Sequence, residues 1–259
     1  MNLQNIRRNW TREETIIAFY VYCIIPFESS SKTNPTVIHY ANLISRTPSA
    51  LNMKIGNIGR LDPELKKKGI TGLTHGAKME EVVWDEFDSN REGLVYEAEK
   101  IIEKLSNKSV EDVYLKSDEI DYSSDDKRRL VKTRINQGFF RSSVLSAYNN
   151  TCAITNIKIN EFLVASHIKP WAVDKKNRLN PHNGICLNSI HDKAFDKGLI
   201  TIDHKFRIII SSRLKEYYSN KFIDDVFKKY DYQKILVPKK FKPSSDFLEY
   251  HNDVIFKGV

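Results

Sequence analysis

The sequence has few of the residues that build disulfide-rich, fibrous or membrane-spanning proteins. Its 259 residues include only three cysteines, ten glycines and eight prolines. Three cysteines form no disulfide framework, and no apolar run approaches the ~20 residues that a membrane helix needs. The first residues, MNLQNIRRNWTREE, lack the apolar region of a signal peptide. We therefore expect a reduced, cytoplasmic protein with no membrane partner.

The composition is that of a folded protein with a basic surface. Hydrophobic residues make up 41% of the chain, which is enough core material for two small domains. At about 150 residues per domain, the length also predicts one to two domains. There are 41 Lys and Arg against 33 Asp and Glu, so the formal net charge is +8. An excess of this size favours a polyanion as partner.

The N-terminal third has a series of helix start and stop signals. Thr11 and Glu14 form a capping box, and Pro26 stops the helix that follows. The pairs Asn34-Pro35 and Thr47-Pro48 each place an N-cap residue before a proline at the first helical position. Two helices joined by a tight turn indicate a helix-turn-helix. With a basic wing at Lys66 to Lys68, the pattern predicts a winged-helix-like DNA-reading domain over residues 1–105.

In the helix that begins at Pro48, three polar residues lie off the apolar face and are the candidates for DNA contact: Asn52, Lys54 and Asn57. The alternative is a small helical domain that packs on the rest of the protein and touches no DNA. Residues 106–126 are acidic, polar and poor in apolar periodicity, so we interpret them as a linker. The basic run KRRLVKTRINQ follows at once, and its Arg134 is a candidate phosphate contact. A solvated helix face is the equal alternative for this run.

The stretch from residue 163 to residue 202 combines two short strands and a helix. An apolar run ends in ASHIKPW, and a second apolar run follows the turn dipeptide Asn183-Gly184. Asn188 or Ser189 can cap a helix that ends at Gly198, where a left-handed residue is expected. The pattern therefore predicts a hairpin packed against a helix, with His167 on the first strand and His191 in the first turn of the helix.

Four blocks of the C-terminal half resemble the HNH endonuclease family, in particular its restriction and defence nucleases. In order along the chain they are INQGFFRSSVLSAYNNTCAITN, ASHIKPW, NPHNGICLNSIHDKAFDKGLI and FLEYHNDVIF. The resemblance implies a ββα-metal nuclease domain over residues 127–259. Together with the helical N-terminal domain, it implies an α+β protein.

The resemblance also implies roles for individual residues. His167 matches the general base, and His191 matches a metal ligand on the helix. Asn183 matches the middle residue of the motif, whose amide can bond across the loop and hold the base strand. The implied cofactor is a divalent metal, with Mg²⁺ first and Mn²⁺, Co²⁺ or Ni²⁺ as alternatives. Lys169 and Arg178 flank the site and are candidates for phosphate contact.

One position departs from the commonest pattern of the family. Many HNH enzymes carry Asp or His directly before the base, as a second metal ligand, and this chain has Ser166 there. Either water takes the place, which Mg²⁺ tolerates, or another carboxylate contributes, with Asp192 as the nearest candidate. Asp196 lies further round the helix, and we expect it to form a structural salt bridge.

The resulting prediction is metal-dependent cleavage of double-stranded DNA in a restriction-type reaction. A reader domain joined to such a nuclease resembles modification-dependent restriction enzymes, which favours N6-methyladenine in DNA as the feature recognised. The aromatics Trp10 and Trp84 could line a pocket for the modified base, and ordinary core packing is their alternative. A conventional restriction enzyme and a non-catalytic DNA-binding regulator stay open as other functions. A palindromic site would imply a homodimer.

Overall fold

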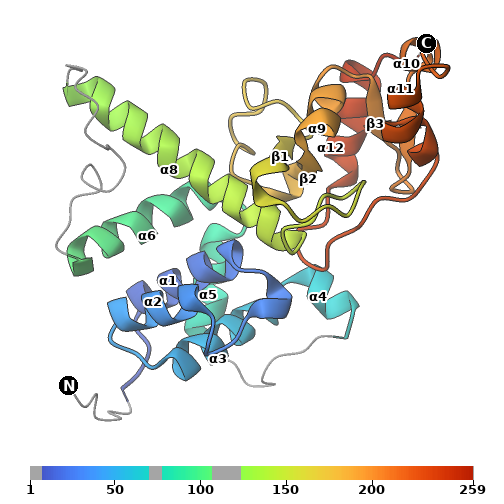
Figure 1. Ribbon diagram of the computed structural model, residues 1–259. Helices are drawn as coiled ribbons and strands as arrows, with labels where there is room; N and C mark the ends of the chain where they lie inside the picture. The colour runs from blue at the N-terminus through green and yellow to red at the C-terminus, as the bar shows by residue number, and fades with distance from the viewer. Residues whose placement is uncertain (1–7, 70–77, 107–123, 259) are drawn as a thin grey trace. The chain divides into compact units, whose positions relative to one another are not determined.

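The computed structural model of the protein describes residues 8–69, 78–106 and 124–258 (Figure 1). The chain divides into two compact units, Met1–Ser143 and Val144–Val259. The division falls inside helix α8 (Ser124–Ala147). Residues 127–143, which we assigned to the nuclease domain, thus group with the first unit. The predicted linker lies almost wholly outside the described residues.

The first three helices begin at the residues that the sequence indicates. Helix α1 (Arg12–Ile24) has the capping box of Thr11 and Glu14 and ends before Pro26. Helix α2 (Pro35–Leu43) is capped by the Asn34 side chain, and helix α3 (Pro48–Gly59) by that of Thr47. These local signals are strong because a side-chain oxygen at the N-cap takes up a backbone N–H that the helix itself leaves unbonded.

The rest of the first unit is also helical. It contains α4 (Pro63–Lys67), α5 (Lys78–Phe87) and α6 (Arg91–Ser106). Within the part of this unit that the structure describes there is no β-strand. Two of the lysines predicted to form a wing end helix α4 instead, and the segment after Gly69 lies outside the described residues. The unit is therefore helical, and its winged-helix form is not shown.

Helix α1 forms the centre of the first unit. Its residues from Glu14 to Cys23 are all buried, and α2, α3, α5 and α6 pack around it. The Phe19 ring stacks on Trp84 of α5 with ring centroids 4.9 Å apart. Such aromatic pairs contribute about 0.5–1.5 kcal/mol beyond the area that they bury. A helix that is apolar all round belongs in a core, which explains this central position.

The second unit is built on the predicted hairpin and helix. Strands β1 (Leu163–His167) and β2 (Gly184–Asn188) pair antiparallel, and helix α9 (Ser189–Asp196) follows β2 directly and packs on both strands (Figure 1). Strands β3 (Ile200–Ile202) and β4 (Ile208–Ile210) form the second, closing hairpin. Mixed helix and strand content confirms the predicted α+β class.

Short helices complete the second unit: η2 (Asn160–Phe162), η3 (Pro181–Asn183), α10 (Ser212–Lys215), α11 (Lys221–Val226), η4 (Lys228–Tyr230), α12 (Ser245–Tyr250) and the π-helix η5 (His251–Ile255).

The C-terminal segment is fastened to the end of α9. Gly198 has a φ of 66°, and an added Cβ would collide with the Ile255 carbonyl oxygen. The Gly198 carbonyl also accepts a hydrogen bond from the Lys257 N–H at 2.9 Å. Only glycine fits this close approach.

Candidate active site

The hairpin brings two residues of the motif to one end of its strands. His167 is the last residue of β1 and pairs with Gly184, the first residue of β2. Asn183 precedes that glycine, so it lies at the same end of the hairpin as the histidine. Helix α9 begins directly after β2, with the Asn188 side chain accepting from the first free backbone N–H groups. No loop separates β2 from α9, and the last residue of the strand is also the N-cap of the helix.

A backbone carbonyl contacts the His167 ring at one of its nitrogens. Its Nε2 lies 3.0 Å from the carbonyl oxygen of Arg178. A carbonyl oxygen can only accept, so Nε2 carries the proton in the neutral ring, and Nδ1 is the nitrogen that can take one up. Burial lowers the pKa of His167, and the hydrogen bond to Arg178 partly offsets this. The ring is therefore neutral at pH 7, as a general base must be.

Asn183 bonds across the loop that joins the two strands. Its amide oxygen accepts from the Lys169 N–H at 2.8 Å, and its amide nitrogen donates to the Lys169 carbonyl at 3.0 Å. The same nitrogen lies 3.4 Å from the Asn177 carbonyl, and the Ile168 N–H donates to the Asn183 carbonyl at 3.0 Å. The side chain is fully buried. The Asn183 amide therefore bridges the residues that follow β1 and the residue that precedes β2.

His191 does not have the surroundings of a metal ligand. Its ring is buried against Phe227 and Tyr230. Nε2 lies 2.9 Å from the Val226 carbonyl oxygen, and Nδ1 lies 3.1 Å from the Asn188 amide oxygen. Both ring nitrogens thus face protein oxygens, and a metal would have to displace one of them. The geometry argues against the predicted role, and His191 instead ties α9 to the end of α11.

Two carboxylates of α9, Asp192 and Asp196, lie on one face of the helix. Asp192 and Asp196 are four residues apart, which brings them within about 40° of each other around the axis. Partial burial raises the pKa of both carboxyl groups, and the charge of Asp192 raises the pKa of Asp196 further. Asp196 as a residue is exposed, so solvent screening moderates the effect on its carboxyl group. Neither group forms an ion pair within the described parts of the chain, so the structural salt bridge expected for Asp196 is absent there.

Ser166 connects these carboxylates to the hairpin. It precedes His167 on β1, and its hydroxyl lies close enough to Asp192 to lower the pKa of that carboxyl group. The Ser166 hydroxyl is nevertheless buried and makes no well-formed hydrogen bond. A buried hydroxyl without a bond costs about 1–3 kcal/mol. A further group that binds at this point would relieve that cost.

The donor set fits a hard cation better than a soft one. Carboxylate, hydroxyl and water oxygens are the ligands that Mg²⁺ prefers, and Mg²⁺ keeps several of its waters. Two close carboxylates with raised pKa values gain from a cation between them. Among the described residues, no three His, Cys, Asp or Glu side chains gather closely enough to form a complete protein cage. The residues thus fit a cation held through two carboxylates and water.

Two basic residues beside the site, Lys169 and Arg178, are already engaged with the protein. The Lys169 ammonium lies 3.3 Å from Asp174 and 4.8 Å from the Tyr250 ring centroid. The Arg178 Nε donates to the Trp171 carbonyl at 2.9 Å. Arg134 is an exposed residue of α8 that groups with the first unit. A phosphate contact therefore stays a prediction for these residues, and for Lys169 and Arg178 it would compete with the internal bonds.

The polar residues of α3 point into their own unit. Lys54 is 4% exposed and lies 2.6 Å from the Glu80 carboxylate. The Asn57 amide nitrogen lies 3.4 Å from the same carboxylate, and the Asn52 amide oxygen accepts from the Ser30 hydroxyl at 2.9 Å. The prediction that Lys54 contacts DNA needs correction, because a buried lysine paired with a glutamate has no surface to offer a phosphate.

The two tryptophans proposed for a modified-base pocket belong to the packing of the first unit. Trp84 is 7% exposed and stacked on Phe19. Trp10 has the Arg46 guanidinium carbon and the Lys54 ammonium each 4.7 Å from its ring centroid. Both rings are occupied by neighbours of their own chain. Ordinary packing, the alternative considered for them, describes what the structure shows.

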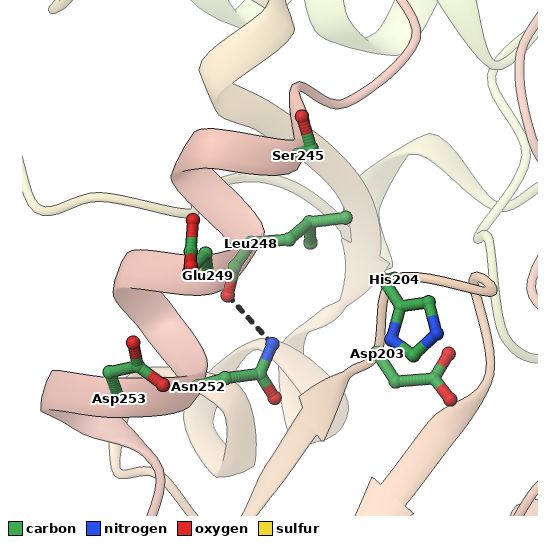
Figure 2. A pocket seen from close by; sticks show the side chains of 7 residues that line it. All are labelled: Asp203, His204, Ser245, Leu248, Glu249, Asn252 and Asp253. Carbon is green, nitrogen blue, oxygen red and sulfur yellow. Dashed lines mark hydrogen bonds between the residues drawn. The ribbon is translucent and has the colours of Figure 1, made fainter.

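A separate cavity of about 440 Å³ lies in the second unit, between the β3–β4 turn and the C-terminal helix (Figure 2). It is lined by Asp203, His204, Ser245, Leu248, Glu249, Asn252 and Asp253. None of the predicted site residues lines it. The Asn252 amide donates to the Leu248 carbonyl at 2.7 Å, and the Asp203 carboxylate is bonded to Arg207. Two of its polar groups therefore maintain local structure.

Comparison with known proteins supports the location of the site. Residues 152–203 match the model of a family described as HNH endonuclease. The matched segment contains β1, the loop after it, β2 and α9. No curated protein matches the chain. In the described parts of the chain, no helix combines the length and apolarity needed to cross a bilayer. A match to this family indicates a nuclease that acts on DNA, and nucleases of the family generally use a divalent metal.

Two features of the site escaped the sequence analysis. The first is that Asp196 shares a face of α9 with Asp192, the carboxylate already considered as a ligand, which their spacing by four residues could have indicated. The second is the contact of His167 with the Arg178 carbonyl. No sequence pattern points to that contact, because it involves a backbone atom of an irregular loop eleven residues away.

We predict that the protein loses stability as pH falls from 6.5 towards 4. Burial lowers the pKa of His191 and of His251 to about 4. Each histidine is neutral in the folded protein and binds a proton more readily in the unfolded chain. Its contribution to the free energy of unfolding is therefore complete above pH 6.5 and is lost as pH falls to about 4. At pH 5 the loss is roughly 2 kcal/mol for each residue. Urea denaturation followed by circular dichroism at pH 7.5 and pH 5 measures it.

A matched pair of variants identifies the source of this pH dependence. His251→Gln should remove about half of the loss between the two pH values. His204→Gln, at an exposed histidine, should leave the loss unchanged. An unaltered pH dependence in His251→Gln would show that the buried histidine is not responsible.

Proposed function

We propose that the protein is a metal-dependent endonuclease that hydrolyses phosphodiester bonds of double-stranded DNA. The observation that carries the proposal is the bond between His167 Nε2 and the Arg178 carbonyl, which leaves Nδ1 as the basic nitrogen. This histidine ends a strand packed against a helix with two close carboxylates. The match of residues 152–203 to the HNH endonuclease family supports the same proposal.

The reaction follows from these groups. His167 Nδ1 takes a proton from a water molecule, and the water oxygen attacks the phosphorus atom. The bond from phosphorus to the 3′ oxygen breaks, and the departing oxygen takes a proton from solvent water, which leaves a 5′-phosphate and a 3′-hydroxyl. When bound, a divalent cation supplies positive charge to the phosphate and to the leaving oxygen. Asp192 and Asp196 would hold it, and Asn183 keeps the loop of the base strand in place.

We predict that His167→Ala lowers the rate of DNA cleavage by about 10²–10⁴-fold, the usual contribution of a general base. The measurement is single-turnover cleavage of plasmid DNA with Mg²⁺, Mn²⁺, Co²⁺ or Ni²⁺. DNA binding and the circular dichroism spectrum should be unchanged. His204→Ala, at an exposed histidine of the same unit, should cut at the wild-type rate. Wild-type cleavage by His167→Ala would refute the base assignment.

The assignment of the metal to the carboxylates gives a second prediction. Asp192→Asn and Asp196→Asn should each weaken Mn²⁺ binding by at least about tenfold, because each substitution removes one negative ligand. Titration calorimetry or electron paramagnetic resonance of the DNA-free protein measures this binding directly. His191→Gln should keep Mn²⁺ affinity as long as it folds. The reverse result, loss only in His191→Gln, would restore the histidine as the ligand.

We further propose that the protein acts as a restriction-type enzyme. The helical first unit joined to a nuclease unit favours an enzyme that reads DNA before cutting it, and palindromic recognition would imply a homodimer. We predict faster cleavage of adenine-methylated than of unmethylated plasmid. One methyl group supplies about 1–3 kcal/mol of discrimination, or roughly 10–200-fold. Equal rates on plasmids from methylating and non-methylating hosts would leave a conventional restriction enzyme.

Ser166 favours a second candidate function. A residue that binds Mg²⁺ poorly at a usual ligand position is what a degenerate nuclease would carry. Such a protein would bind DNA as a regulator and cut it with none of the four metals. The cleavage series with Mg²⁺, Mn²⁺, Co²⁺ and Ni²⁺ separates the two functions.

A further inference from the structure

The loop between β1 and β2 is closed on itself by Trp171 and Arg178. The Arg178 Nε donates to the Trp171 carbonyl at 2.9 Å. The Arg178 guanidinium carbon also lies 5.2 Å from the centroid of the Trp171 ring. One arginine thus contacts both the backbone and the ring of the tryptophan seven residues before it.

The same two residues contact His167 from two directions. The Arg178 carbonyl oxygen lies 3.0 Å from His167 Nε2. The Trp171 ring meets the His167 ring edge to face, with centroids 5.5 Å apart and planes at 89°. The backbone of Arg178 therefore touches the histidine, while its side chain is anchored on the tryptophan beside that histidine.

This arrangement determines which nitrogen of the ring carries the proton. With the proton on Nε2, the ring donates to the Arg178 carbonyl. With the proton on Nδ1, the Nε2 lone pair would face the lone pairs of that carbonyl, which is repulsive. The carbonyl stays in place only if the backbone at Arg178 stays in place. Asn183 fixes the loop at Lys169 and Asn177, and the arginine side chain fixes it at residue 178.

We propose that Trp171 and Arg178 are positioning residues that hold the Arg178 carbonyl against His167 and so keep Nδ1 as the basic nitrogen. The inference rests on the proposed function, since it concerns the base of that reaction. It assigns the Arg178 side chain to the loop, whereas the sequence pattern indicated a phosphate contact. These two roles predict different behaviour for one conservative substitution.

Arg178→Lys separates the two roles. Lysine keeps the positive charge that a phosphate contact needs. It lacks the planar group that stacks on an aromatic ring, and it lacks Nε, which donates to the Trp171 carbonyl. Positioning by Arg178 therefore predicts a loss in Arg178→Lys that the retained charge does not prevent. Trp171→Ala should act in the same direction, and Trp171→Phe, which keeps an aromatic ring, should recover most of the loss.

The experiment combines kinetics with a spectroscopic measurement on the full-length protein. Single-turnover cleavage with saturating Mg²⁺ gives the rate constant, and fluorescence anisotropy in Ca²⁺ gives the Kd for a duplex oligonucleotide. Nitrogen-15 spectra of histidine-labelled protein without DNA report which ring nitrogen of His167 carries the proton. His167→Gln identifies the signals. The control is Tyr232→Ala, which removes another ring contacted by an arginine, since the Arg207 guanidinium carbon lies 5.7 Å from its centroid.

We expect the rate constant of Arg178→Lys and of Trp171→Ala to fall by roughly tenfold or more, since small displacements of a reacting group are costly. The Kd should change less than about threefold, and the His167 signals should show a mixture of the two protonation sites. Trp171→Phe and Tyr232→Ala should keep a single Nε2-protonated form.

Two results would overturn the inference. One is a wild-type rate in Arg178→Lys with His167 protonated only on Nε2. The other is a slower reaction in which the protonation site is unchanged, because the residues would then act on something other than the base. The spectra need no DNA and no cleavage. A wild-type protein that fails to cut would therefore refute the proposed function and leave the positioning of His167 to be judged from the spectra.

Discussion

The buried Asn183 amide is the interaction on which the candidate site depends. It meets both the N–H and the carbonyl of Lys169, at 2.8 and 3.0 Å, across the loop between β1 and β2, which is irregular up to the short helix η3. A long irregular loop leaves its backbone groups to be satisfied one by one. A single side-chain amide can satisfy a donor and an acceptor together. The first residues after β1 are thereby held against the start of β2.

The consequences extend from this bond to His167, the proposed base. Once both ends of the loop are held at the hairpin, the Arg178 carbonyl can approach His167 in a defined direction. The site thus separates two tasks. Strand pairing and the amide hold the backbone, and a backbone carbonyl selects the proton position on the ring. A catalytic histidine positioned in this way needs no neighbouring carboxylate to select its tautomer.

Helix α9 divides its polar residues between two sides. His191 is buried, bonded to the Val226 carbonyl, and fastens the helix to the segment that covers it. Asp192, one residue further, is the carboxylate close to Ser166 of β1. Consecutive helical residues differ by about 100° in direction, so one of them can face the core while the next faces the strand. The order of letters in a motif does not reveal this division.

The sequence by itself determined the local elements. Thr11, Asn34 and Thr47 begin helices because an N-cap oxygen acts within three residues. Gly198 ends α9 because its left-handed backbone favours glycine. The hairpin, the helix after it and the end of the strand at His167 follow from the same short-range rules. The amide bridge of Asn183 was also within reach, since the family resemblance implied it.

Only the tertiary structure decided which side chains are available for chemistry. Lys54 appears on a polar face in the sequence, but Glu80 of another helix takes its charge into the core. His191 matches a ligand position, but the Val226 carbonyl, 35 residues later, occupies its Nε2. Trp84 is buried against Phe19. In each case the deciding partner is distant in the chain, and local periodicity carries no information about contacts between elements that pack only after the chain has folded.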